Sequence, residues 1–292
     1  MTTHRSLGVA AVIAAAVLWG TTGTVQTLLP PLREPLAVGA LRLIFGAVAL
    51  LVLAMADPAS RRAWHRLPWR GVLFAGVSIG LYNLFFFWAV TKAGVGPGTA
   101  IAIGSAPIWA TLYEVAVAGR RPGPVRLAGQ AVSVLGVAIL SLSGGGPAGS
   151  LVGVGLALLA GASYASYSLA TSAIGHRAPS TTLAAATFAV AAVFTAPVLF
   201  MVPTAWIVGP MAWGALAFLG VAATGLSYAL YTWGLTRVAA STAVTLALAE
   251  PVTAWLLATF AVGEPVTLQS ALGVALILGG LAVVTGRSDR GR

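Results

Sequence analysis

The chain has 292 residues, of which 59% are hydrophobic and 8% are charged, with a formal net charge of +10. Soluble domains usually contain about 25% charged residues, so this composition and a mean hydropathy of +0.95 exclude an ordinary water-soluble fold and indicate a membrane protein. The chain has no cysteine, which excludes disulfides, thiolate metal sites and cysteine nucleophiles.

Charged or Pro/Gly-rich clusters divide the chain into apolar runs of about 20 residues, the length that a transmembrane helix needs. We predict ten such helices, at residues 7–29, 36–56, 71–91, 98–118, 127–143, 152–174, 182–202, 212–234, 240–262 and 268–286. The first run continues to Leu29, well beyond the apolar core of a signal peptide, so we expect an uncleaved helix. The short connections favour antiparallel neighbours.

The basic residues are distributed unequally between alternate loops. With the N-terminus inside, all but three of the 16 Lys and Arg residues fall in cytoplasmic segments: Arg5, Arg61, Arg62, Arg66, Arg70, Arg120, Arg121, Arg126, Arg177, Arg237, Arg287, Arg290 and Arg292. Arg33 and Lys92 lie in opposite loops, and Arg42 lies within the second helix. By the positive-inside rule, we expect a multi-pass protein of a bacterial-type inner (plasma) membrane with both termini cytoplasmic. This explanation of the basic loops leaves no need for a nucleic-acid partner.

Residues recur along the chain at an offset of 145. Gly8, Trp19, Gly80, Trp88, Thr91 and Lys92 correspond to Gly153, Tyr164, Gly225, Trp233, Thr236 and Arg237. At an offset of 144, Pro107, Gly129 and Gly136 correspond to Pro251, Gly273 and Gly280.

The repeat predicts the fold class, an all-α polytopic membrane protein of ten transmembrane helices. Each unit holds five helices, an odd number, so the second unit enters the membrane from the opposite side, and two inverted repeats surround a central cavity. We assign residues 1–143 to the first repeat, 144–150 to a linker, and 151–292 to the second repeat with a cytoplasmic tail. The glycine-rich linker lacks the Lys-Ser/Thr of a phosphate-binding loop.

Polar and aromatic residues form matching stripes on four of the predicted helices. Trp19, Thr22, Gly23 and Gln26 share one face of the first helix, and the offset carries them onto Tyr164, Tyr167, Ser168 and Thr171 in the sixth. The third helix carries Tyr82, Asn83, Phe86 and Phe87, and the eighth carries Ser227, Tyr228, Tyr231 and Thr232. Close helix packing or an interfacial aromatic belt is the alternative explanation for such residues. A belt, however, does not place Trp19, Tyr164 and Tyr228 deep within their spans.

Glu250 stands near the middle of the ninth helix, immediately before Pro251. Ionisable groups in hydrocarbon are costly and usually mark function, and the missing proline N–H permits a kink at this point. Three roles remain open for Glu250: accepting a substrate ammonium group, carrying a coupling proton, or hydrogen-bonding a neighbouring helix as a neutral acid. The equivalent position in the first repeat, within Ser105-Ala106-Pro107, is not acidic, so we expect an asymmetric site.

Arg42 and Glu114 are the other ionisable residues within the predicted helices that bear on the site. We expect Arg42 to snorkel outward or pair with a carboxylate. We expect Glu114 to form a structural ion pair or gate contact near Arg120 and Arg121.

The residues that an enzyme would need are missing from the spans. His4, His65 and His176 all fall in cytoplasmic segments, and no Ser-His pair, paired intramembrane aspartates or HExxH motif is present. We therefore expect no enzymatic activity, no metal site and no cofactor.

The stretch from Ala249 to Val284, AEPVTAWLLATFAVGEPVTLQSALGVALILGGLAVV, resembles the second-repeat ending of the EamA-type members of the drug/metabolite transporter superfamily. Leu18-Trp19-Gly20, Leu41-Arg42 and Ala106-Pro107 resemble the first repeat. The resemblance covers almost the whole chain. It implies a ten-helix basket whose cavity is lined mainly by helices 1, 3, 4, 6, 8 and 9 and which exports or exchanges small metabolites.

The segment YNLFFFWAV and the aromatic-rich lining are most similar to the bacterial amino-acid exporters of the YddG type. Unlike the sugar-phosphate carriers of the superfamily, the chain has no Lys or Arg in the middle of helices 3, 4, 8 or 9, because Lys92 and Arg237 lie at the span ends.

We therefore expect a secondary transporter that exports amino acids with apolar or aromatic side chains by alternating access. Its partners would be the substrate, the lipid bilayer and, if Glu250 carries a coupling proton, protons. Proton-coupled efflux of lipophilic cations is the alternative transport function, and a passive channel or membrane scaffold is the alternative class. The candidate substrate-binding residues are Trp19, Thr22, Tyr82, Asn83, Phe86, Trp109, Tyr164, Tyr167, Ser168, Ser227, Tyr228, Tyr231 and Glu250.

Overall fold

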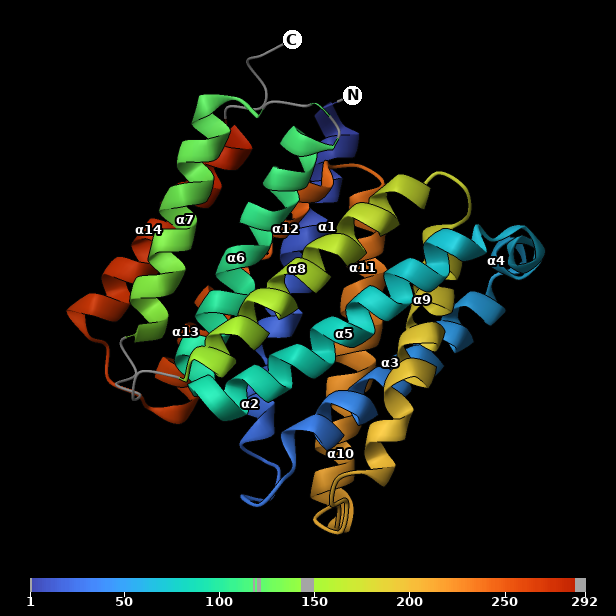
Figure 1. Ribbon diagram of the computed structural model, residues 1–292, viewed down its shortest axis with the longest axis horizontal. Helices are drawn as coiled ribbons and strands as arrows, with labels where there is room; N and C mark the ends of the chain where they lie inside the picture. Colours follow the sequence, from blue (N-terminus) through green and yellow to red (C-terminus); the bar gives the residue numbers. More distant parts are fainter. Residues whose placement is uncertain (1, 118, 120–121, 143–149, 287–292) are drawn as a thin grey trace.

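The computed structural model describes residues 2–117, 119, 122–142 and 150–286, and all regular structure in these ranges is helical (Figure 1). The helices of the first half are α1 (Thr2–Gly20), α2 (Thr22–Gln26), α3 (Pro35–Ala56), α4 (Pro58–Ala63), η1 (Trp64–Arg66), α5 (Trp69–Ala93), α6 (Val95–Ala116) and α7 (Pro124–Leu142). Those of the second half are α8 (Leu151–Ile174), α9 (Ser180–Thr195), η2 (Ala196–Phe200), α10 (Gly209–Gly220), η3 (Val221–Leu226), α11 (Ser227–Leu235), α12 (Ala240–Leu246), α13 (Ala249–Leu257), η4 (Ala258–Val262) and α14 (Leu268–Gly286).

Within the described residues, nine helical segments are long and apolar enough to cross a membrane. They match nine of the ten predicted spans to within a few residues at each end. The remaining predicted span is α6, a helix of 22 residues whose glycine, proline, serine and threonine content keeps it outside that set. The count of ten spans therefore stays a prediction. Most of the predicted linker, residues 144–149, lies outside the described residues.

The last helices of the two repeats, α7 and α14, lie side by side at one edge of the molecule (Figure 1). A Cβ atom added at Gly129 would come within 2.9 Å of the Gly280 carbonyl oxygen, and one at Gly136 would come within 2.7 Å of the Gly273 oxygen. The residue numbers rise on one helix as they fall on the other, so the two equivalent helices run antiparallel. This arrangement shows that the two repeats are inverted with respect to each other.

The same inversion exchanges the contacts of the first helix in each repeat. A Cβ atom at Gly8 of α1 would meet Val238, 3.3 Å away, and one at the equivalent Gly153 of α8 would meet Ala93, 2.7 Å away. Val238 and Ala93 are themselves related by the offset of 145. The first helix of each repeat thus packs against the end of the third helix of the other repeat. Small residues permit this close approach in the absence of a hydrophobic driving force between helices in lipid.

Besides the seventh predicted span, which ends in the 3₁₀-helix η2, three membrane-crossing segments are interrupted along their length. The first predicted span is divided at Thr21 between α1 and α2, and the ninth predicted span is divided at Ala247 and Leu248 between α12 and α13. The eighth contains the π-helical segment η3 between α10 and α11. A Cβ atom at Gly20 would lie 2.8 Å from the Glu250 carbonyl oxygen, so the break in the first segment packs directly against the break in the ninth.

Candidate substrate cavity

A cavity of about 440 Å³ lies where the interrupted helices meet. Its size falls in the range of about 300–1,000 Å³ that is usual for small-molecule sites. Residues of the first, second, third, fourth, sixth, eighth and ninth predicted spans line it, so α3 joins the six helices that the resemblance implied. The lining residues are Trp19, Gly20, Thr22, Gly23, Gln26, Pro31, Arg33, Pro35, Arg42, Tyr82, Phe86, Phe87, Val90, Val95, Thr99, Ala102, Ile103, Tyr164, Tyr228, Ala247, Glu250 and Ala254.

Aromatic side chains form much of the cavity wall. The ring centroid of Trp19 lies 4.8 Å from that of Tyr228 and 6.1 Å from that of Tyr164, and Tyr82 lies 5.3 Å from Tyr164 and 5.7 Å from Phe86. The rings are tilted or edge-on, which are favoured geometries for aromatic pairs. These five rings come from α1, α5, α8 and α11, so residues far apart in the sequence form one continuous surface.

A second layer of side chains supports this wall from behind and does not line the cavity. Tyr167 and Tyr231 are fully buried, and their rings are stacked at 6.3 Å. The hydroxyls of Ser168 and Tyr231 are hydrogen-bonded at 2.9 Å, and the Ser227 hydroxyl donates to the Ala223 carbonyl of its own segment at 2.9 Å. The structure therefore places these four sequence candidates in packing and intersegment bonding.

Two further candidates lie away from the cavity. Asn83 is buried, and its side chain packs against α3: a Cβ atom added at Gly39 would lie 2.8 Å from the Asn83 Nδ2 atom. Trp109 is 39% exposed and lies in the half of α6 that is remote from the cavity-lining Thr99 and Ile103. The periodicity of a single helix did not reveal which of its faces meets the cavity.

Glu250 lines the cavity in the first turn of α13. An acidic side chain is favoured at a helix N-terminus, where the backbone N–H groups lack intrahelical acceptors. Pro251 also stands in this first turn, where its missing N–H costs no helical hydrogen bond. The local sequence thus explains why a helix starts here and presents a carboxyl group to the cavity.

Arg42 of α3 lines the same cavity, a position that the sequence analysis did not predict. Its Nε atom donates to the hydroxyl of Thr224 in η3 at 3.1 Å. Thr224 is fully buried and donates in turn to the Leu219 carbonyl at 2.8 Å. The sequence analysis expected Arg42 to snorkel outward or to pair with a carboxylate; the structure instead places it at the cavity, bonded to Thr224.

The cavity reaches the surface at the connection between α2 and α3. Pro31 is exposed there and lines the cavity together with Arg33 and Pro35. Val95, at the start of α6, lines the same end. The opposite end of α6 is held by a network of polar side chains.

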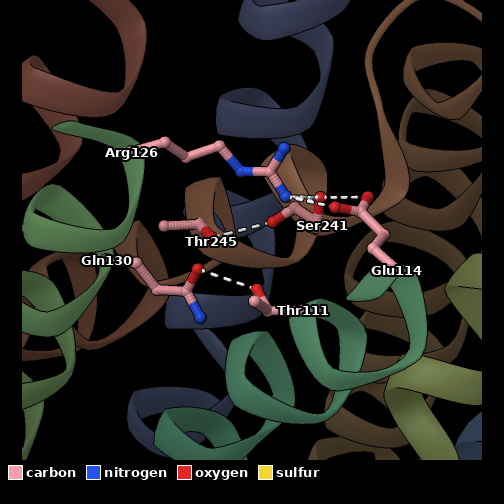
Figure 2. A network of polar contacts seen from close by, with 6 residues as sticks. All are labelled: Thr111, Glu114, Arg126, Gln130, Ser241 and Thr245. Carbon is pink, nitrogen blue, oxygen red and sulfur yellow. Dashed lines mark hydrogen bonds and ion pairs between the residues drawn. The ribbon is translucent and has the colours of Figure 1, made fainter. Parts of the chain in front are cut away.

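This network joins the end of α6 to the starts of α7 and α12 (Figure 2). The Arg126 guanidinium pairs with the Glu114 carboxylate and also donates to Ser241, whose hydroxyl donates to the second Glu114 oxygen. One turn further along, Thr111 donates to Gln130 at 3.0 Å. The expected ion pair of Glu114 is therefore present with Arg126; Arg120 and Arg121 lie outside the described residues.

Comparisons with known proteins agree with this architecture. The model of the EamA-like transporter family matches the chain twice, over residues 6–142 and 151–286. The uncharacterized transporter YwfM of Bacillus subtilis (strain 168) is 39% identical over 275 residues, which cover 94% of this chain and 92% of that protein.

A solved crystal structure of a protein superposes with a TM-score of 0.85 at 24% identity, over 98% of this chain and 99% of the other. At this identity the likeness concerns the fold alone. The two family matches and the 39% identical relative identify a multi-pass membrane transporter of small molecules, not an enzyme. The chain thus belongs to the EamA-like transporter family, within the drug/metabolite transporter superfamily.

Proposed function

We propose that the protein exports small zwitterionic amino acids with apolar or aromatic side chains across a bacterial inner membrane. The observation that carries this proposal is the cavity, in which six aromatic rings and the Glu250 carboxyl group line one space. Aromatic walls bury an apolar side chain and stack on an aromatic one. The similarity of the YNLFFFWAV segment to exporters of the YddG type supports the same substrate class.

In the proposed complex, the substrate side chain lies among Trp19, Tyr82, Phe86 and Tyr164, and its ammonium group faces Glu250. Thr22 and Tyr228 supply hydroxyl groups at the cavity wall. The layer behind this wall, formed by Tyr167, Ser168, Ser227 and Tyr231, supports it.

Alternating access is the proposed mechanism. The inverted repeats allow the two halves to exchange conformations, which exposes a fixed central site to one side and then the other. The arginine distribution puts the α2–α3 connection outside and both termini in the cytoplasm. The cavity then faces outward, and the network of Glu114, Arg126 and Ser241 closes the cytoplasmic side.

Efflux of lipophilic cations is the second candidate, favoured by the position of Glu250 among aromatic rings. A positively charged Arg42 in the same cavity opposes a substrate with a net positive charge, because charges interact strongly where water is scarce. This argument ranks zwitterions above cations.

The test is flux into liposomes that contain the purified protein, with amino acids, phosphorylated metabolites and quaternary ammonium ions, each with and without a pH gradient. We expect saturable exchange of phenylalanine and leucine. Transport confined to quaternary ammonium ions would favour the second candidate, and flux without saturation would favour a channel.

A further inference from the structure

The Arg42 side chain carries a fixed charge within a membrane-crossing helix. A charged residue at membrane depth is costly and is retained where it faces a cavity or a partner. Among the described residues, no carboxylate lies within ion-pairing distance of its guanidinium. The ion pair in this part of the chain joins two other residues, Arg126 and Glu114. Glu250 lines the same cavity without pairing to it. The Arg42 guanidinium therefore has no direct ion-pair partner, and the Glu250 carboxyl group interacts with its charge only from a distance.

The position of Arg42 is fixed by the neighbouring segment of the eighth span. Its Nε atom is held by Thr224, and a Cβ atom at Gly46, one turn further along α3, would lie 2.5 Å from the Thr224 Cγ2 atom. This tight packing sets the side chain of Thr224, which in turn orients the guanidinium. The two Nη groups are left for a ligand, and their planar fork matches the two oxygens of a carboxylate.

Trp19 also lines the cavity, but its indole nitrogen is covered by protein and does not open into it. Its side chain is 5% exposed and lines the same space as Arg42. Within the described part of the chain, its Nε1–H group has no hydrogen-bond acceptor. An indole nitrogen only donates, and a buried donor without a partner is costly. The Arg42 Nη groups are therefore the donors that the cavity offers to a ligand, and the Trp19 N–H lies behind its wall.

We infer that Arg42 binds the carboxylate of the substrate, while Glu250 faces its ammonium group. This inference rests on the proposed function, because it assigns the two charged groups of an amino-acid substrate to two side chains of opposite charge in one cavity. A phosphate fits less well, since its second negative charge would face Glu250. An amine without a carboxylate leaves Arg42 unpaired, and a site that leaves a buried polar group unpaired rejects such an analogue strongly.

The experiment measures binding to the purified full-length protein by tryptophan fluorescence and calorimetry. The probes are phenylalanine, 3-phenylpropionate, which lacks the ammonium group, and phenethylamine, which lacks the carboxylate. Arg42→Gln should weaken binding of phenylalanine and 3-phenylpropionate by about tenfold to a hundredfold, the effect of losing a charged hydrogen bond. Phenethylamine should bind as well as before or better.

Two further variants separate binding from folding. Arg42→Lys keeps the charge without the planar fork, so it should restore part of the affinity for carboxylates. Thr224→Val removes the partner of Nε and leaves Arg42 in place, so it should weaken phenylalanine binding less than Arg42→Gln does. Lys92→Gln is the matched control. Lys92 is an exposed cation near the same end of the molecule, and it does not line the cavity. This substitution should leave all three affinities unchanged.

The outcomes distinguish this inference from the proposed function. If Arg42→Gln and Thr224→Val alter all three probes equally, or none, the carboxylate site is wrong even where phenylalanine is transported. If the wild-type protein transports no amino acid yet binds 3-phenylpropionate through Arg42, the proposed function is wrong and the carboxylate site stands. If the wild-type protein binds none of the probes, both are overturned.

Discussion

Glu250 shows how a single residue joins local helix chemistry to the proposed transport site. Its carboxyl group stands in the first turn of α13 and lines the aromatic cavity, and its backbone carbonyl packs closely against Gly20 of α1. The equivalent position in the first repeat holds no acid. The duplicated scaffold is therefore nearly symmetric, whereas the charge that it presents to the cavity is not.

Replacing Glu250 by Gln tests its three possible roles, because the substitution keeps size and hydrogen bonding but removes the negative charge. If Glu250 faces the substrate ammonium, affinity for phenylalanine should fall by about tenfold or more. If it carries a coupling proton, accumulation driven by a pH gradient should disappear while counterflow exchange continues. Affinity, exchange and pH-driven uptake are measured on the same reconstituted variant; unchanged values in all three would reject both functional roles.

Replacing Trp19, Tyr82, Tyr164 or Tyr228 by Ala should each reduce affinity for phenylalanine. An aromatic pair contributes about 0.5–1.5 kcal/mol beyond its buried area, so we expect losses of at least about threefold to tenfold. Substrate concentration series in liposomes measure these losses. Trp88→Ala is the control, because Trp88 is 47% exposed and does not line the cavity. Normal transport by all four variants would show that the substrate binds elsewhere.

At the scale of elements, two equivalent prolines have different structural consequences. Pro107 lies inside α6, which continues through it, whereas Pro251 lies in the first turn of α13, just after a break. A proline therefore did not by itself determine where a helix is interrupted. The break at Ala247 and Leu248 also depends on the close contact with Gly20, because backbone groups at a break in a membrane need protein around them.

The packing of α14 on α7 is tested by two adjacent glycines of α14. A Cβ atom at Gly280 would lie 2.5 Å from the Gly129 carbonyl oxygen, whereas one at Gly279 would meet nothing within 4 Å. Gly280→Ala should therefore destabilise the protein by about 1–3 kcal/mol through overpacking. Gly279→Ala should be neutral or slightly stabilising, because alanine favours helix. Thermal unfolding in detergent compares the two, and equal melting temperatures would contradict this packing.

The network at the end of α6 predicts a gate. Glu114→Gln and Ser241→Ala each remove a member of the network in Figure 2, so each should disfavour the closed arrangement by about 1–3 kcal/mol. A single cysteine at Thr245 should then react about tenfold faster with maleimide applied from the cytoplasmic side.

The control for the gate is Ser166→Ala, which removes a hydrogen bond to Ala162 within α8 and leaves the network intact. It should not change the labelling of the cysteine. If the network variants also leave labelling and transport rate unchanged, the network has a structural role without gating.

At the scale of the whole molecule, the arginine distribution predicts the orientation in the membrane. The chain has no native cysteine, so single cysteines report on one position each. A cysteine at the exposed Ser150 should react with an impermeant maleimide in intact cells, and one at the exposed Ala59 should react only after lysis. The reverse pattern would overturn the proposed orientation, and with it the direction in which the cavity opens.

Composition, hydropathy and the offset of 145 residues determined the membrane class, the span positions and the inverted repeat. These properties follow from local sequence. Each span must satisfy its backbone hydrogen bonds within its own helix, and an odd number of spans in the first repeat makes the second repeat enter the membrane from the opposite side. The antiparallel contacts of α7 with α14 confirm the inversion.

The composition of the cavity was decided by tertiary structure. Helical periodicity brought Trp19, Tyr82, Phe86, Tyr164, Tyr228 and Glu250 into consideration, but it gave the same weight to Tyr167, Ser168 and Tyr231, which form the layer behind. The sequence also did not indicate which residue Arg42 would bond to, or that its side chain would face the cavity. A helix in a bundle has several buried faces, and the packing of neighbours from the other repeat determines which face meets the cavity. That choice depends on contacts between residues as distant as Arg42 and Thr224, which the sequence of either helix alone does not contain.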